Sequence, residues 1–148
     1  MKKNLILGLL ISVFFCSSFV IAADAEKAIK YRRGVFNVMG WNFGSMAAMI
    51  KGKIPFDANT FARNAEIVAF MSQLPLEGFV EGSDEGDTKA RPEIWLNMED
   101  FEAKMKKMQK EVGVLAEIAK KGNFDALKSQ LKEVGEACKG CHDDYRNK

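Results

Sequence analysis

Apolar residues recur every three or four positions along four segments of the chain, and no segment alternates apolar and polar residues in the manner of a β-strand. The segments run from about residue 24 to 51, from 57 to 75, from 97 to 122 and from 123 to 145. Each segment alone would expose an apolar stripe, so the stripes must pack against one another. The pattern predicts an all-α fold, an antiparallel up-down four-helix bundle.

The apolar stripe of the first segment is interrupted by one charged residue, Arg32. Its members follow at steps of four and three: Ile29, Arg32, Phe36, Met39, Phe43, Met46 and Ile50. A buried guanidinium costs on the order of several kcal/mol unless it is paired, and no acid occupies a stripe position on another segment. Arg32 therefore either pairs with an anionic group that the bundle encloses or extends its side chain to solvent.

Helix-ending signals divide the segments. Asp57 is a candidate N-cap, Pro75 should end the second helix, and Gly122 should end the third. The acidic, glycine-rich connection from 75 to 97 is longer than a bundle needs, so it is either a functional loop or a solvated crossover.

The N-terminus has the pattern of an export signal. Lys2 and Lys3 precede an apolar stretch from 5 to 21, and small residues follow. We expect residues 1–23 to be removed, with cleavage between Ala22 and Ala25. The remaining domain spans residues 24–148.

An uncleaved membrane anchor at residues 4–23 is the alternative, since this stretch nearly reaches the length of a spanning helix. Small residues at its end favour a signal, so we expect a periplasmic protein without stable membrane insertion. The full chain has 22 basic and 20 acidic residues, and two of the lysines lie in the signal, so the exported domain is neutral. A neutral domain without a basic face argues against a nucleic-acid partner.

The sequence CKGCH near the C-terminus holds both cysteines of the exported domain and the chain's one histidine. At about 100° per residue, Cys138, Cys141 and His142 fall in one sector of a helix, and both cysteines occupy stripe positions. Thioether bonds from both sulfurs to a porphyrin would place the imidazole beside its iron. The motif predicts one covalently attached haem c inside the bundle.

Other interpretations of this motif are weaker. A structural zinc site needs four ligands, and the exported domain has no further Cys or His. A thioredoxin-like pair belongs to a strand-and-helix context. A surface disulfide and two free thiols are the remaining alternatives.

Four stretches resemble the cytochrome c prime family of class II c-type cytochromes: KYRRGVF, GKIPFDA, ARPEIW and CKGCHDDYR. The resemblance covers the whole exported domain. It implies a four-helix bundle, usually a homodimer, whose five-coordinate haem iron binds nitric oxide and carbon monoxide and discriminates against dioxygen. Members are also classed as electron carriers, so the resemblance implies no enzymatic activity and a redox partner that the sequence does not identify.

The resemblance also implies roles for individual residues. On the last helix, the resemblance implies that Cys138 and Cys141 attach the haem through thioether bonds, that His142 ligates the iron and that Arg146 is the proximal basic residue. On the first helix, it implies that Arg32 contacts a haem propionate, that Arg33 flanks the haem and that Phe36 covers the open face of the iron. It also implies that a loop near Ser83 and Asp84 touches the haem.

The second face of the iron is less constrained by the residues themselves. Met39 or Met46 could ligate it, which would favour a six-coordinate electron carrier, although both have ordinary core spacing. Phe36, one turn from Arg32, could instead crowd out a sixth ligand, or it could simply pack in the core. Trp41 and Met49, off the first stripe, are candidates for a dimer interface.

Overall fold

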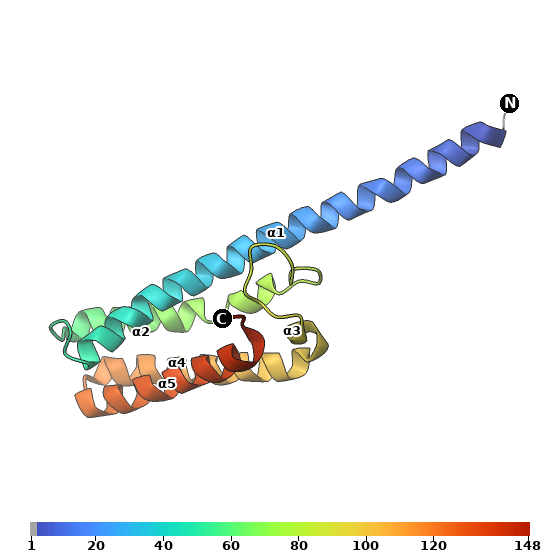
Figure 1. Cartoon of the computed structure of the whole chain (residues 1–148). Helices are drawn as coiled ribbons and strands as arrows, with labels where there is room; N and C mark the ends of the chain where they lie inside the picture. Colours follow the sequence, from blue (N-terminus) through green and yellow to red (C-terminus); the bar gives the residue numbers. More distant parts are fainter. Residues whose placement is uncertain (1–2) are drawn as a thin grey trace.

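The computed structural model describes the backbone of residues 3–148 and the side chains of residues 24–148. Four long helices form the bundle in Figure 1: α1 (Lys3–Ile50), α2 (Ala58–Met71), α4 (Met98–Lys121) and α5 (Phe124–Tyr145). A 3₁₀ helix η1 (Pro75–Gly78) and a single turn α3 (Glu93–Leu96) lie in the α2–α4 connection. No β-strand occurs in residues 3–148, and the predicted all-α bundle is confirmed.

Two of the three predicted helix boundaries are confirmed by local hydrogen bonds or backbone conformation, and the third is not. The Asp57 carboxylate accepts a hydrogen bond from the Thr60 amide at 2.7 Å and caps α2. Gly122 adopts φ 70° after α4, a left-handed conformation that glycine reaches without strain. The expected end of α2 at Pro75 is wrong: α2 ends at Met71, and Pro75 instead opens η1, where its missing N–H leaves no hydrogen bond unmade.

The first helix differs from the prediction at its N-terminal end. The helix continues back from residue 24 to Lys3, because residues 22–27 include several strong helix formers and neither glycine nor proline. The side chains of residues 1–23 lie outside the described part of the chain, so the signal peptide stays a prediction. Within the described residues, none of the helices combines the length and the apolar character needed to span a bilayer.

The buried stripe of α1 follows a slightly different line from the predicted one. Its buried members are Ala25, Ile29, Arg32, Val35, Met39, Asn42, Met46 and Met49. Phe36 and Phe43 lie half-buried along one flank of this stripe. Met49 is therefore a core residue, and its predicted place in a dimer interface is wrong. Trp41 points outward, with 82% of its surface exposed.

Close backbone packing joins α1 to α2, α2 to α4 and α4 to α5. The fully buried core residues of these helices include Phe61, Val112, Leu115 and Val134. Among the described residues, α1 and α5, which would close the ring of four, approach each other closely at few positions at most. One side of the bundle is thus more loosely closed than the other three.

Candidate functional site

The predicted attachment residues lie near the end of α5. Cys138 and Cys141 are half-buried against the core, and their thiols form no disulfide. Gly135, one turn before Cys138, lies against α1, because a Cβ built on it would be 3.8 Å from Cζ of Phe43. Cys138, about 60° from Gly135 around the helix, is therefore turned toward α1, whereas Cys141 lies near Lys104 and Asp100 of α4.

The surroundings of the two sulfurs disfavour a redox-active pair. Burial raises the pKa of the Cys138 thiol, and it raises the pKa of Cys141 to about 11 although Lys104 partly opposes the shift. Reactive cysteines have a lowered pKa, because the thiolate is the nucleophile. Residues 24–148 also contain no group of three or more Cys, His, Asp or Glu placed to hold a metal ion.

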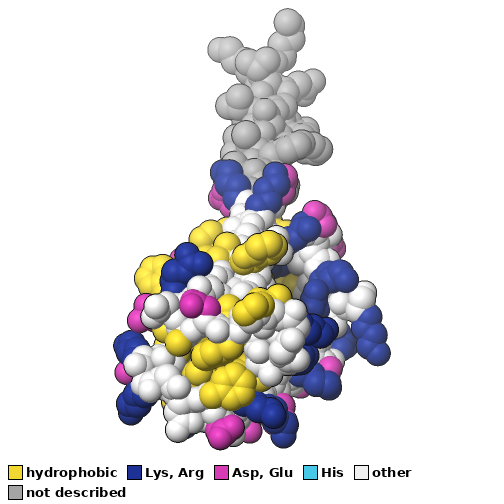
Figure 2. All heavy atoms as spheres, turned by 90° about the vertical axis from the view of Figure 1, so that its left-hand side faces the viewer, with side chains coloured by type: hydrophobic (Ala, Val, Ile, Leu, Met, Phe, Trp, Pro, Cys, Tyr) yellow, Lys and Arg dark blue, Asp and Glu magenta, His cyan; other side chains and the backbone are white. Residues whose placement is uncertain are grey.

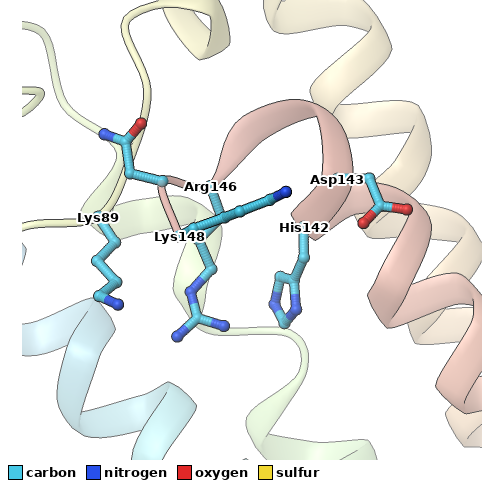
Figure 3. A pocket seen from close by; sticks show the side chains of 6 residues that line it. Lys89, His142, Asp143, Arg146 and Lys148 are labelled. Atoms are coloured by element: carbon cyan, nitrogen blue, oxygen red, sulfur yellow. The ribbon is translucent and has the colours of Figure 1, made fainter.

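A hollow of about 440 Å³ lies beside His142 at the C-terminal end of α5. In Figure 3 the His142 ring, the Arg146 guanidinium and the Lys89 side chain extend into the same space, whereas the Asp143 carboxylate points away. The ring is open to solvent on one side, yet the protein atoms around it and the positive charge of Arg146 lower the pKa of His142. A neutral imidazole is the form that ligates a metal.

Arg32 on α1 is 2% exposed and fastens the connection between η1 and α3. We call residues 79–92 of this connection the strap. Nη1 donates to the Gly78 carbonyl and the Ser83 hydroxyl, both at 2.6 Å. Nη2 donates to the Ser83 carbonyl at 2.5 Å and to the Thr88 hydroxyl at 2.8 Å. The alternative in which Arg32 extends to solvent is wrong, since the strap supplies acceptors inside the protein.

Two aromatic rings enclose the same guanidinium. Its Cζ lies 4.5 Å from the ring centre of Phe79 and 5.9 Å from that of Trp95. Burial lowers the pKa of Arg32 to about 10, an effect that the nearby Asp84 carboxylate partly offsets. Arg32 stays charged at neutral pH, and both terminal nitrogens already have protein acceptors. A haem propionate would have to share or replace these contacts, so that role stays a prediction.

The remaining predicted residues lie around the strap. Ser83 is fully buried and accepts from Arg32, so the structure assigns it a contact within the protein. Arg33, at the surface, donates to the backbone carbonyl of Asp87 at 2.7 Å and also pairs with its carboxylate. Phe36 meets Phe79 edge to face, with ring centres 6.4 Å apart. The structure thus brings the predicted α1 residues together with the strap.

Sequence reasoning missed three residues that build this region: Gly78, Phe79 and Thr88. The need for glycine at position 78 is evident only from the structure, in which a Cβ there would lie 2.8 Å from Cβ of Arg32. Phe79 joins the aromatic rings of Phe36 and Phe101. Thr88 carries no sequence signal, since its role depends on where an irregular segment crosses α1.

Comparison with known proteins decides the family. Residues 27–146 match the family model described as Cytochrome C'. The chain belongs to the cytochrome c prime family. It is 42% identical over 130 residues to cytochrome c' from Halomonas halodenitrificans, covering 84% of this chain and 98% of that protein. Cytochrome c' from Rubrivivax gelatinosus is 41% identical and covers 82% of this chain and 95% of its own length.

Solved structures give the same assignment. Cytochrome c prime from Shewanella frigidimarina superposes with a TM-score of 0.82 at 44% identity, covering 84% of this chain and 97% of that one. A nitric oxide complex of a cytochrome c prime variant from Alcaligenes xylosoxidans superposes with a TM-score of 0.77 at 38% identity. The match covers 84% of this chain and 96% of that one. Cytochrome c prime proteins carry covalent haem c, so this chain is a c-type haem protein.

The residues present fit such a group. The cysteines and His142 lie on α5, whereas Arg32 and Phe36 lie on α1, and among the described residues the backbones of these two helices are not closely packed. A flat apolar group between α1 and α5 would contact both sets. Half-buried Phe36 and Phe43, on the flank of the α1 stripe, would then be covered.

Proposed function

We propose that this cytochrome c prime is an exported protein whose five-coordinate haem iron binds nitric oxide and carbon monoxide and undergoes one-electron redox change. The observation that carries the proposal is the placement of CxxCH near the end of α5, with Cys138 turned toward α1, Phe36 on that helix and the chain's one histidine already used. The haem supplies an iron that changes oxidation state and offers a coordination position.

The residues of α5 would hold the haem from one side. Cys138 and Cys141 would attach it through their sulfurs, and His142 would ligate its iron. Arg146, whose guanidinium extends into the same hollow as the imidazole, would supply positive charge on that side. Burial and the positive charge of Arg146 lower the pKa of His142, which supports this role because they favour the neutral imidazole that ligates a metal.

The residues of α1 and the strap would shape the opposite side. Phe36 would cover the iron with an apolar ring that offers no hydrogen bond, which disfavours dioxygen relative to nitric oxide and carbon monoxide. Arg32 and Arg33 would flank the haem edge, with Ser83 and Asp84 in the loop beside it. The nitric oxide complex of the Alcaligenes xylosoxidans relative supports gas binding.

Spectroscopy of the purified, haem-loaded protein tests this proposal. The oxidised and reduced absorption and EPR spectra should be those of a five-coordinate iron, and nitric oxide should shift the bands of the reduced protein. Unchanged bands at saturating nitric oxide would contradict gas binding. A Phe36→Ala variant should bind carbon monoxide faster than wild type. An equal rate would show that Phe36 does not limit access to the iron.

A six-coordinate electron carrier is the second candidate function. It requires a methionine ligand, and Met46, at 0% exposure, is held inside the core. A low-spin spectrum that a methionine substitution abolishes would favour this candidate. In either case we propose an unidentified redox partner and no enzymatic turnover.

Export and dimerisation complete the proposal. A mature protein beginning between residues 23 and 25, found in the periplasmic fraction by mass spectrometry, would establish cleavage of the signal. For a homodimer, exposed apolar side chains on neighbouring α1 and α2 give support: Val38 and Trp41 on α1, and Phe70 on α2. A Trp41→Lys variant should elute as a monomer if Trp41 lies in the interface.

A further inference from the structure

One hydroxyl oxygen joins the two sides of the proposed haem site. Thr88 Oγ1, in the strap, accepts a hydrogen bond from Arg32 Nη2 at 2.8 Å and another from the Ala90 amide at 3.0 Å. The first donor belongs to α1. The second belongs to the residue that pairs with the end of α5.

That pairing is a short antiparallel bridge between Ala90 and Arg146. The Asn147 amide donates to the Lys89 carbonyl at 2.8 Å, and the Arg91 amide donates to the Tyr145 carbonyl at 3.1 Å. In Figure 1 the C-terminus accordingly lies next to the strap. The last residues of the chain are thus held by the strap as well as by their own helix.

One further hydrogen bond connects the bridge to the backbone of His142. The Arg146 amide donates to the His142 carbonyl at 3.2 Å in the last turn of α5. Hydrogen bonds therefore run from the buried Arg32 through Thr88 and the bridge to the residue that would ligate the iron. The Arg32 end of this series of hydrogen bonds is fixed, because Arg32 is buried and its Nη1 also donates to Gly78 and Ser83.

We propose that Thr88 is a positioning residue for His142: its hydroxyl ties α1 to the bridge at the end of α5 and so sets where the imidazole lies relative to the haem. This rests on the proposed function, in which His142 ligates the iron. Contacts that hold the backbone of His142 would limit where its imidazole can lie, as supporting hydrogen bonds orient ligands at other metal centres.

The test compares haem-loaded wild type with two variants. Thr88→Val keeps the side-chain shape and removes the hydroxyl, whereas Thr88→Ser keeps the hydroxyl. Thr60→Val makes the same chemical change at the start of α2, at the other end of the bundle, and serves as the control. Two quantities are measured: amide hydrogen exchange at Arg91 and Asn147, and the iron–histidine stretching band of the reduced protein by resonance Raman spectroscopy.

Thr88→Val should speed exchange at both amides about tenfold, the effect of losing one hydrogen bond from a local opening equilibrium. It should also shift the iron–histidine band, while Thr88→Ser and Thr60→Val leave exchange and band as in wild type. Faster exchange with an unmoved band would overturn the proposal, because the strap would then be purely structural. Unchanged exchange would also overturn it.

Failure of the proposed function would look different. A wild-type protein without an iron–histidine band would contradict five-coordinate ligation by His142 whatever the variants do. The reduction potentials of wild type, Thr88→Val and Thr88→Ser would then decide the proposal, because ligand geometry affects the potential at either coordination number. The proposal would be supported if the reduction potential of Thr88→Val differs from that of wild type while that of Thr88→Ser does not. Equal potentials in all three proteins would overturn it.

Discussion

The two ends of the bundle are held together by different kinds of contact. At the far end, formed by the turns 51–57 and 122–123, aromatic rings pack together: the ring centre of Phe56 lies 5.8 Å from that of Phe61 and 5.1 Å from that of Phe124. Figure 2 looks onto this end and shows hydrophobic side chains across its middle with lysine and arginine around them. At the strap end, directed hydrogen bonds from Arg32 join residues 46 to 56 positions apart.

This difference separates a structural end from a functional one. Apolar packing has no preferred direction, so the far end needs only the right shape and the right caps. Hydrogen bonds require their partners within a few tenths of an ångström, so the strap end holds its groups in one geometry. Precise placement is what the residues around a haem need, and it occurs at the end that carries CxxCH.

The largest expected loss tests the packing of the far end. Phe61 is fully buried, so Phe61→Ala should lower the free energy of unfolding by about 3 to 5 kcal/mol through lost burial and a cavity. Phe124, 41% exposed, is the matched control, and Phe124→Ala should cost about 1 kcal/mol. Urea unfolding of the haem-loaded proteins measures both. Equal losses would show that the two rings are not distinguished by burial.

The next largest effect tests the polar hub of the strap. Arg32→Met keeps most of the side-chain volume but leaves the acceptors of Gly78, Ser83 and Thr88 without their donor, so we expect a loss of about 3 kcal/mol. Arg33→Met, next to it on the surface, should cost less than about 1 kcal/mol. Hydrogen exchange should rise in the strap and not at the far end. A uniform rise over both ends would contradict the separation of the two regions.

The far end illustrates what local sequence patterns can predict. The caps at Asp57 and Gly122 are signals contained within a few residues, and the structure confirms both. The periodicity also placed the helices, because burial of an apolar stripe depends on spacing alone. On α1 it was one residue off at three places, choosing Phe36, Phe43 and Ile50 over Val35, Asn42 and Met49, since a periodic pattern does not distinguish the centre of a stripe from its flank.

The strap end illustrates what such patterns do not contain. Arg32 was singled out as a charge among apolar residues, yet its partners lie in an irregular segment far along the chain. Their hydrogen bonds depend on the path of the strap across α1, which no periodicity describes. The CxxCH motif was predictable because its chemistry needs only adjacent positions, whereas Thr88 was not, because its role depends on tertiary contacts.

A smaller effect tests how closely α1 and η1 approach. Gly78→Ala would place a Cβ 2.8 Å from Cβ of Arg32 and 3.0 Å from the Ala28 carbonyl oxygen, so the helices must separate. We expect a loss of about 2 kcal/mol. Gly113→Ala, in the middle of α4 with no atom within 4 Å of the new Cβ, should instead stabilise by about 0.5 to 1 kcal/mol. Thermal unfolding measures both, and a gain for Gly78→Ala would refute the close approach.

The smallest effect concerns Tyr145, whose hydroxyl donates to the Asp100 carboxylate at 2.5 Å. This hydrogen bond is the main reason that the pKa of Tyr145 is raised to about 12. Because the folded state holds the phenolic proton more tightly than the unfolded state, the resulting stability is complete below pH 10 and declines as pH rises from 10 to 12. Tyr145→Phe should therefore cost about 1 kcal/mol at pH 8 and progressively less above pH 10.

Urea unfolding of wild type and Tyr145→Phe between pH 8 and 11 measures this difference, in which the titration of Arg32 cancels because both proteins contain it. The phenol absorbance of wild type should also show one of its two tyrosines titrating near pH 12, and the variant should lack that step. A difference independent of pH would mean that the hydroxyl contributes by packing alone. The strap end would then depend less on directed hydrogen bonds than its contrast with the far end implies.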